Sequence, residues 1–313
     1  TYKTAYLLGK FKFPISDFLD KVEKKSFFTS ILLTLIWTSL IPLMSFYFKS
    51  SILPFVIFTP ALFISFVSST YSGYLSGNLL FTTIAALTVF ESLVKLVAAV
   101  IFVKVGLPEL VYASIPISLF LSFLISWFAI GRIKKAELPL KLSFNLSFPK
   151  GFYITSILTK LSSVAFLSFD IVLAKLYLEP KAAGEYALLS LSGKIIYFLG
   201  VLFSQFIVPV ISKTEGAQKN SKFVFYKLLG ISTLASLAGF VAIGVFGKFT
   251  IPYLFGEKSL GITQYLLLYS YAIFSFSVAS SVIIYHQIKR HYLFPIIGVL
   301  VAFYQVYLIS LNH

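Results

Sequence analysis

Ionisable side chains inside long apolar stretches are the residues of this sequence whose types and spacing could do chemistry. Between residues 152 and 213 they are Lys160, Asp170 and Lys194. Placing such a group in hydrocarbon costs roughly 2.5–3.5 kcal/mol on insertion scales. A chain that keeps three of them must turn them toward a partner or a water-filled cavity, which is typical of a transport pathway.

The same stretch predicts a helical hairpin whose outer turn spans residues 179–184. Asp170 and Lys194 lie about two turns below that outer turn on the two antiparallel arms, so they could pair across the hairpin. One interpretation is therefore a structural ion pair without a transport role. Lys160 has no obvious mate in the hairpin. It could attract an anionic headgroup or phosphate, or it could extend to the inner interface of the membrane.

Polar residues follow one face of each arm. The first arm carries five of them within an arc of roughly 100°; they are Ser156, Thr159, Lys160, Ser163 and Asp170. In the second arm, Lys194 and Gln205 are 11 residues apart, which returns to the same face within about 20°, with Tyr197 between them. The residues expected to bind substrate are Lys160, Lys194, Gln205 and Tyr197.

A further charged pair, Glu91 and Lys95, lies within an earlier apolar stretch. The i,i+4 spacing places both side chains on one helical face within reach of an ion pair. One interpretation is a self-neutralised pair that packs the helix. The other is a coupling carboxylate gated by its lysine, with Asp170 as a second coupling or gating residue.

The composition determines which elements must position these groups. Of 313 residues, 58% are hydrophobic and 12% charged, whereas soluble domains carry about 25% charged residues. The apolar runs are about 20 residues long, which suits membrane-crossing helices, and they lack the alternation of barrel strands. We predict an all-α, polytopic helical membrane protein. The nine predicted spans are 26–48, 52–75, 80–104, 108–131, 151–177, 185–211, 227–247, 262–284 and 293–311.

The net charge of +15 does not indicate nucleic-acid binding, because the basic residues cluster in a few loops between spans. With residues 1–25 on the cytoplasmic side, 17 Lys and Arg lie inside and five outside. This bias predicts a multi-pass protein of the cell membrane with residues 1–25 in the cytoplasm. That segment is either a basic amphipathic connector on the membrane surface or an ordinary loop.

The longest inside loop, residues 132–150, carries five basic residues and two prolines. We predict that it links two lobes. Residues 1–131 would form an incomplete N-terminal lobe with four spans after the basic connector. Residues 151–313 would form a C-terminal lobe with five spans, lacking its last.

No catalytic arrangement is present in the sequence. There is no cysteine, no histidine beside a Ser nucleophile, no Gly-rich phosphate loop and no carboxylate cluster suited to a metal. We therefore expect a protein that is not an enzyme and has no cofactor or metal. A membrane glycosyltransferase is a further alternative. It would need a catalytic carboxylate in a sizeable inner or outer loop, and the sequence does not provide one.

Three stretches resemble the polysaccharide-exporter branch of the multidrug/oligosaccharidyl-lipid/polysaccharide flippase superfamily, which includes O-antigen and lipid II flippases. Residues 169–212 resemble its seventh and eighth helices through Asp170, Gly184, Tyr186, Val208 and Pro209. Residues 251–274, with the sequence Leu-Phe-Gly-Glu, resemble the loop between its ninth and tenth helices. Residues 71–81, YSGYLSGNLLF, are similar to an Arg-Gly-x-x-Gln-Gly motif at the end of its fourth helix.

The resemblance implies two helical lobes around a central cavity, alternating access, and coupling to an ion gradient or membrane potential. It also implies that the nine spans correspond to helices three to eleven of about twelve to fourteen, and that Asp170 is functional. Ser72 and Ser76 depart from the motif, because they stand where Arg and Gln often occur. Gly73 and Gly77 form a small-xxx-small pattern, which predicts close helix packing.

The leading hypothesis is a flippase that moves a lipid-linked oligosaccharide of the polyprenyl-phosphate type from the cytoplasmic to the outer leaflet. Its expected partners are this glycan and membrane lipids, without nucleic acid and with an unspecified coupling ion, and we expect a monomer. One alternative is a cation-coupled multidrug exporter of the same fold, which predicts a cavity dominated by carboxylates. Another is a non-transporting membrane scaffold in which all intramembrane charges are paired.

Overall fold

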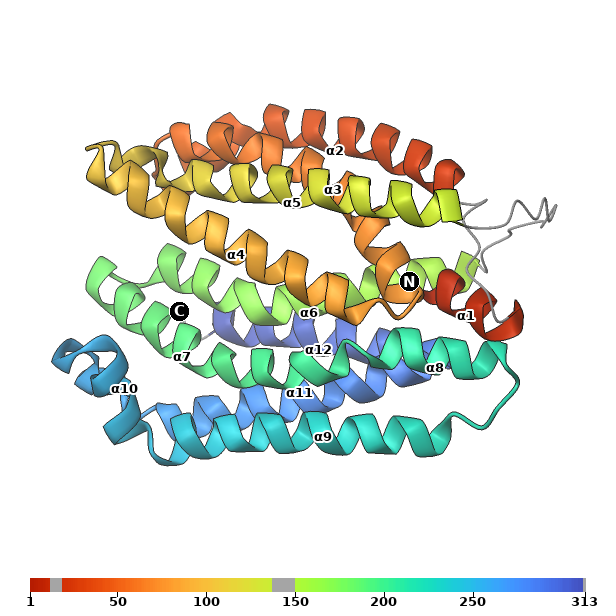
Figure 1. Ribbon diagram of the computed structural model, residues 1–313. Helices are drawn as coiled ribbons and strands as arrows, with labels where there is room; N and C mark the ends of the chain where they lie inside the picture. Colours follow the sequence, from red (N-terminus) through yellow and green to blue (C-terminus); the bar gives the residue numbers. More distant parts are fainter. Residues whose placement is uncertain (12–18, 137–149, 312–313) are drawn as a thin grey trace. The chain divides into compact units, whose positions relative to one another are not determined.

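The computed structural model describes residues 1–11, 19–136 and 150–311 (Figure 1). Within these ranges all regular structure is helical. Nine helices in this part of the chain are long and apolar enough to cross a membrane. The prediction of an all-α, polytopic membrane protein is confirmed, and the chain is a multi-pass membrane protein.

The described residues form two compact units. The first contains helices α1–α5 together with residues 212–218, and the second contains the helices that follow without that segment. The end of α5, Ala136, extends into the predicted linker 132–150. Residues 137–149 of that linker lie outside the described residues.

The first unit is a bundle in which α3 lies between α2 and α5, and α4 packs on α5 (Figure 1). Its elements are α1 (Tyr2–Phe11), α2 (Leu19–Phe48), α3 (Leu53–Gly77), α4 (Phe81–Lys104), the short 3₁₀ helix η1 (Pro108–Ala113) and α5 (Ser114–Ala136). Their contact faces bury a compact core. The core residues are Leu19, Val67, Tyr71, Tyr74, Leu75 and Ile130.

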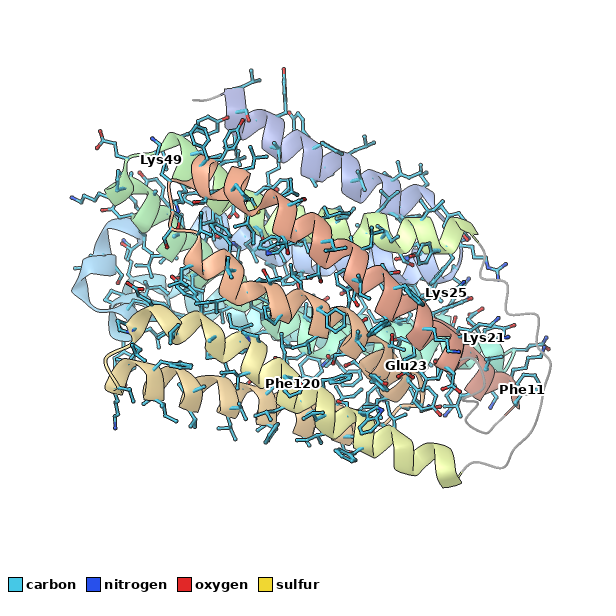
Figure 2. The ribbon with its side chains drawn as sticks, turned by 90° about the horizontal axis from the view of Figure 1, so that it is seen from above. Phe11, Lys21, Glu23, Lys25, Lys49 and Phe120 are labelled. Carbon is cyan, nitrogen blue, oxygen red and sulfur yellow. The ribbon has the colours of Figure 1, made fainter. Side chains whose placement is uncertain are left out.

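Helix α2 begins at Leu19, seven residues before the predicted start of the first span. Lysine and glutamate are good helix formers, so the helix continues beyond the apolar run. Figure 2 shows Lys21, Glu23 and Lys25 at this end of α2 and Lys49 at the other end. The charged turns therefore extend the span at its predicted cytoplasmic end.

Helix α1 is amphipathic: it buries Thr4 and Leu7 and exposes Lys10. Of the predicted connector 1–25, residues 12–18 lie outside the described residues, and residues 19–25 belong to α2. It packs against the end of α3, where a Cβ on Gly77 would overlap the side chain of Thr4. A Cβ on Gly73 would also press on the start of the chain. The prediction of close helix packing is confirmed at Gly77, whereas the neighbour of Gly73 is Thr1, which precedes α1.

A second glycine contact joins α1 to residues 212–218. A Cβ on Gly9 would overlap the carbonyl of Lys213, and a Cβ on Gly216 would overlap the carbonyl of Tyr6. The two backbones therefore touch directly, each through a glycine of its own. This contact explains why a segment from the second half of the sequence belongs to the first unit.

In the second unit, α7 packs against α9 and α11, and α6 packs against α12 (Figure 1). Its elements are α6 (Lys150–Tyr177), α7 (Pro180–Ser204), the start of α8 (Ile207–Gly216), α9 (Lys222–Phe240), the π-helical segment η2 (Val241–Val245), α10 (Gly247–Phe255), η3 (Glu257–Ile262), α11 (Leu266–Ile288) and α12 (Leu293–Leu311). Its core contains Leu189, Ile196, Ile243, Ile251, Ile262, Leu266 and Ile273.

The predicted sixth span, 185–211, is divided into α7 and α8. The break falls at Gln205 and Phe206, just before Pro209. A proline ring clashes with the carbonyl four residues earlier, which here is that of Gln205. Helix α7 therefore ends at Ser204, and α8 begins at Ile207.

Candidate functional site

The two opposite charges of the hairpin meet in the second unit. Asp170 on α6 and Lys194 on α7 form an ion pair with 3.4 Å between Oδ1 and Nζ. Only 3% of Asp170 and 8% of Lys194 is exposed. The pairing that their depth along the two arms suggested is present, and it is buried.

Three hydroxyl groups complete the surroundings of the carboxylate. Oδ2 of Asp170 accepts hydrogen bonds from Ser190 at 2.8 Å and from Tyr269 at 2.9 Å. Tyr186 donates a longer one, at 3.4 Å. We call these five residues, Asp170, Tyr186, Ser190, Lys194 and Tyr269, the Asp170 cluster.

The cluster joins three helices. Tyr186, Ser190 and Lys194 follow one another at intervals of four along α7, so they share one face of that helix. Asp170 comes from α6 and Tyr269 from α11. Loss of the cluster would therefore loosen the contacts of α7 with α6 and with α11.

A glycine makes room for the tyrosine from α11. A Cβ on Gly193 would overlap Cε1 and Cδ1 of the Tyr269 ring. The ring therefore lies directly on the backbone of α7, which places its hydroxyl between Asp170 and Ser190, 2.9 Å from each of the two acceptors. Gly193 is a positioning residue for the cluster.

The cluster as a whole is a satisfied buried pair. One ammonium group and three hydroxyls face one carboxylate, so the charges cancel and the acceptor oxygens are used. A buried ion pair compensates its desolvation only with such additional hydrogen bonds. The arrangement can lock α6, α7 and α11 together.

A seam of small residues continues this contact along α7. Ser232 of α9 donates to the carbonyl of Gly200 at 2.9 Å, and the hydroxyls of Ser236 and Ser277 are 2.8 Å apart. A Cβ on Gly200 would collide with the hydroxyls of Ser236 and Ser277. At this point α7, α9 and α11 therefore pack closely through glycine and serine, in addition to the apolar core of the unit.

The four residues expected to bind substrate are not brought together. Lys160 is exposed on α6, and no ion pair joins it to another described residue. Gln205 is exposed and donates to the carbonyl of Leu202, three residues earlier, at 2.9 Å. Tyr197 stacks on Phe276, with ring centroids 5.6 Å apart. Only Lys194 belongs to the Asp170 cluster.

The predicted polar stripe of α6 is largely satisfied by the helix itself. The hydroxyls of Ser156, Thr159 and Ser163 each bond to a carbonyl four residues earlier, at 2.7–2.8 Å. Thr159 is buried, whereas its neighbour Lys160 is exposed. A helix turns by 100° per residue, so this arc includes a packed face as well as an open one.

Glu91 and Lys95 form the expected pair on α4 in the first unit. Their Oε1 and Nζ atoms are 3.6 Å apart, and the side chains are 27% and 42% exposed, respectively. The pair lies near the middle of a helix of 24 residues. Charged groups therefore remain on the surface of this unit at the depth of the membrane interior.

Two members of the cluster, Ser190 and Tyr269, are not among the residues predicted from the sequence. Ser190 lies four residues before Lys194, so helical periodicity could have identified it. Tyr186 was identified only as one of the residues through which residues 169–212 resemble the polysaccharide-exporter branch. Tyr269 is 99 residues from Asp170 along the chain, and no local pattern connects the two. Among the described residues, no group of three or more His, Cys, Asp and Glu could hold a metal ion.

Comparison with known proteins gives no match to this chain, whether among family models, curated proteins or solved structures.

Proposed function

We propose that this multi-pass membrane protein moves a lipid-linked oligosaccharide of the polyprenyl-phosphate type from the cytoplasmic to the outer leaflet of the cell membrane. The observation that carries the proposal is that charged side chains within the spans stay at least partly exposed on both units. They are Lys160 on α6 and the pair Glu91 and Lys95 on α4.

The depth of these groups matters for the argument. Lys160 lies ten residues into α6, roughly 15 Å along its axis at 1.5 Å per residue. Lys95 is nine residues from the nearer end of α4, roughly 14 Å along the axis. Exposure to acyl chains at such depth costs roughly 2.5–3.5 kcal/mol for each charge, whereas a hydrated pathway accommodates it.

Each charged group has a role in this proposal. Lys160 attracts the phosphate of the substrate, because it is exposed and no described acidic residue pairs with it. Lys194 becomes available only when the Asp170 cluster opens, so Asp170 gates that second cation. Glu91 changes charge beside Lys95 during the cycle. Tyr197 and Gln205 contact the substrate between these events.

The resemblance of three stretches to the polysaccharide-exporter branch supports the same function by an independent route. The alternating-access mechanism and the glycan substrate class come from that resemblance. A cation-coupled exporter predicts a cavity dominated by carboxylates, whereas Asp170 is enclosed by four donors and the partly exposed Glu91 is paired with Lys95.

The closed Asp170 cluster favours one competing function, that of a membrane scaffold whose charges only hold helices together. The two functions differ in what they require of Lys160. A transporter needs its positive charge, whereas a scaffold tolerates any polar residue at this exposed position.

Transport by reconstituted vesicles tests the proposal. The probe is a fluorescent polyprenyl diphosphate-linked disaccharide, whose exposure in the outer leaflet is measured with a membrane-impermeant quencher. We expect transport by the native chain, transport by Lys160→Arg, and loss of transport by Lys160→Glu. Equal transport by Lys160→Glu, in protein that is folded as judged by thermal unfolding, would contradict the proposal, as would absence of transport by the native chain.

A further inference from the structure

A pocket of about 850 Å³ lies within the first unit, between α2, α3 and α5. Its size is typical of sites for drug-sized ligands and lipids. Seven of its twelve lining residues are aromatic; they are Phe27, Phe28, Phe63, Tyr71, Phe120, Phe123 and Trp127. Neither the proposed transport function nor the Asp170 cluster uses this pocket, because the cluster belongs to the second unit.

One end of the pocket is charged. Asp20, Glu23 and Lys24, from the first turns of α2, line it there. The carboxylate of Glu23 accepts a hydrogen bond from the hydroxyl of Tyr71, a residue of α3 that is only 2% exposed. This bond fixes Glu23 at the border between the charged end and the aromatic wall.

The pocket extends from its charged end into the membrane. Phe63 lies 14 residues before the end of α3, roughly 21 Å along the helix axis. Glu23 lies at the end of α2 that carries Lys21 and Lys25, and Figure 2 shows these residues together. The Lys and Arg bias places this end in the cytoplasm. A bound molecule would therefore have its polar head at the inner interface and an apolar tail among the rings.

The charges at the mouth specify the head. The residues that line the mouth carry both signs of charge, two carboxylates and one ammonium group, so a headgroup of a single sign leaves part of them without a complement. A headgroup with a phosphate and a terminal amine complements both signs. Its amine would donate to Asp20 and Glu23, and its phosphate would accept from Lys24.

We propose that this pocket binds a zwitterionic phospholipid of the inner leaflet whose headgroup ends in a primary ammonium group. One acyl chain lies along the aromatic wall, and the ammonium group donates hydrogen bonds to the carboxylates of α2. A quaternary ammonium headgroup has no N–H to donate, so the pocket distinguishes ethanolamine from choline headgroups.

The chain contains a built-in probe for this site. Of its two tryptophans, Trp127 lines the pocket and Trp37 does not. A Trp37→Phe variant leaves Trp127 as its one fluorophore of this type, and a Trp127→Phe variant leaves Trp37. Phospholipids with brominated acyl chains quench a nearby indole, so titration of brominated lipid into vesicles reports occupancy of the pocket.

We expect Trp127 to be quenched by brominated phosphatidylethanolamine at roughly tenfold lower mole fraction than by matched phosphatidylglycerol or phosphatidylcholine, the factor that one hydrogen bond to a charged group provides. Trp37 should show no headgroup preference. Glu23→Gln should remove the preference at Trp127, because it keeps the shape of the side chain and removes its charge. Lys24→Gln should weaken binding in the same assay, by loss of its contact to the phosphate.

Glu109→Gln is the matched control, because Glu109 is an exposed carboxylate of η1 in the same unit that does not line the pocket. Its preference should equal that of the native chain. Quenching that is independent of the headgroup would show ordinary boundary lipid and overturn the proposal. Stronger quenching by phosphatidylglycerol, equal quenching by phosphatidylcholine, or an unchanged preference in Glu23→Gln would overturn it as well.

Discussion

Two ion pairs of the same chemistry occupy opposite surroundings in this protein. Glu91 and Lys95 lie four residues apart on one helix and are 27% and 42% exposed. Asp170 and Lys194 come from different helices, are nearly fully buried and share their carboxylate with three hydroxyl donors. The first pair is a product of α4 alone, whereas the second exists only when α6, α7 and α11 are packed.

The difference shows what each pair can contribute. An exposed i,i+4 pair adds only about 0.2–0.5 kcal/mol to a helix, so its charges are free to respond to ligand or solvent. A buried pair stabilises specific helix contacts, and the loss of either partner leaves an uncompensated charge. The charges of Glu91 and Lys95 are therefore suited to respond to ligand or solvent. Asp170 and Lys194 are suited to hold their helices together.

The largest effect is expected from removing one member of the buried pair. Asp170→Leu leaves Lys194 without its carboxylate, so we expect a loss of about 3–5 kcal/mol in the free energy of unfolding. The measurement is denaturant-induced unfolding of the purified protein in mixed micelles.

The double variant Asp170→Leu/Lys194→Met is the control for this experiment. It replaces the pair by apolar side chains and should recover most of the lost stability. If the double variant is as unstable as the sum of the two single variants, the pair is not energetically coupled, and the contrast with Glu91 and Lys95 disappears.

The second prediction concerns the glycine beneath the tyrosine ring. Gly193→Ala introduces a methyl group where the ring of Tyr269 lies, so the ring must move and its hydroxyl must leave Asp170. We expect a loss of about 3 kcal/mol, at the upper end of the cost of overpacking, in the same unfolding measurement.

Gly184→Ala is the matched control, because Gly184 lies on the same helix and a Cβ there would meet open space. It should leave stability unchanged or raise it slightly. Equal effects of the two substitutions would mean that Gly193 matters through helix propensity and not through Tyr269.

The third prediction compares the two tyrosines of the cluster. Tyr269→Phe removes a hydrogen bond of 2.9 Å to the carboxylate and should cost about 1.5 kcal/mol. Tyr186→Phe removes one of 3.4 Å and should cost clearly less. Parallel unfolding measurements on both variants show which one loses more free energy of unfolding. A larger loss for Tyr186→Phe would contradict the geometry described for the cluster.

The smallest effect is expected from exchanging the charges of the exposed pair. Glu91→Lys combined with Lys95→Glu keeps an i,i+4 pair on α4, so stability should change by less than about 0.5 kcal/mol. The corresponding exchange of Asp170 and Lys194 should prevent stable folding, because the hydroxyls would then face an ammonium group. If both charge-exchanged variants folded stably, the two pairs would not differ in what they contribute to the fold.

The membrane fold was predictable because long apolar runs have few other structural solutions. Finer elements were not predictable from hydropathy. The sequence analysis assigned residues 248–261 to a loop, yet most of them form α10 and η3, which are too short to leave a span signal. The break in the sixth span was not predicted either. Pro209 does not interrupt the apolar run in the sequence, but its ring interrupts the helix.

The candidate site was predictable only in part, for a similar reason. The depth of Asp170 and Lys194 on antiparallel arms indicated that they could meet. The donors that complete the cluster depend on which faces of α7 and α11 touch, and that depends on Gly193. Helical periodicity placed Lys160, Gln205 and Tyr197 on the same faces as Asp170 and Lys194. In the fold these three residues do not belong to the cluster, because periodicity does not determine which parts of a face are packed.

The contact between α1 and residues 212–218 has a consequence for biosynthesis. Its two halves are about 200 residues apart along the chain, and the segment begins about 75 residues after the last helix of the first unit. At roughly 5–20 residues per second, a ribosome needs several seconds to make that interval. During this time the glycine surface of α1 stays uncovered on the nascent chain, so the first half of the protein is completed only by a late-translated part of the second.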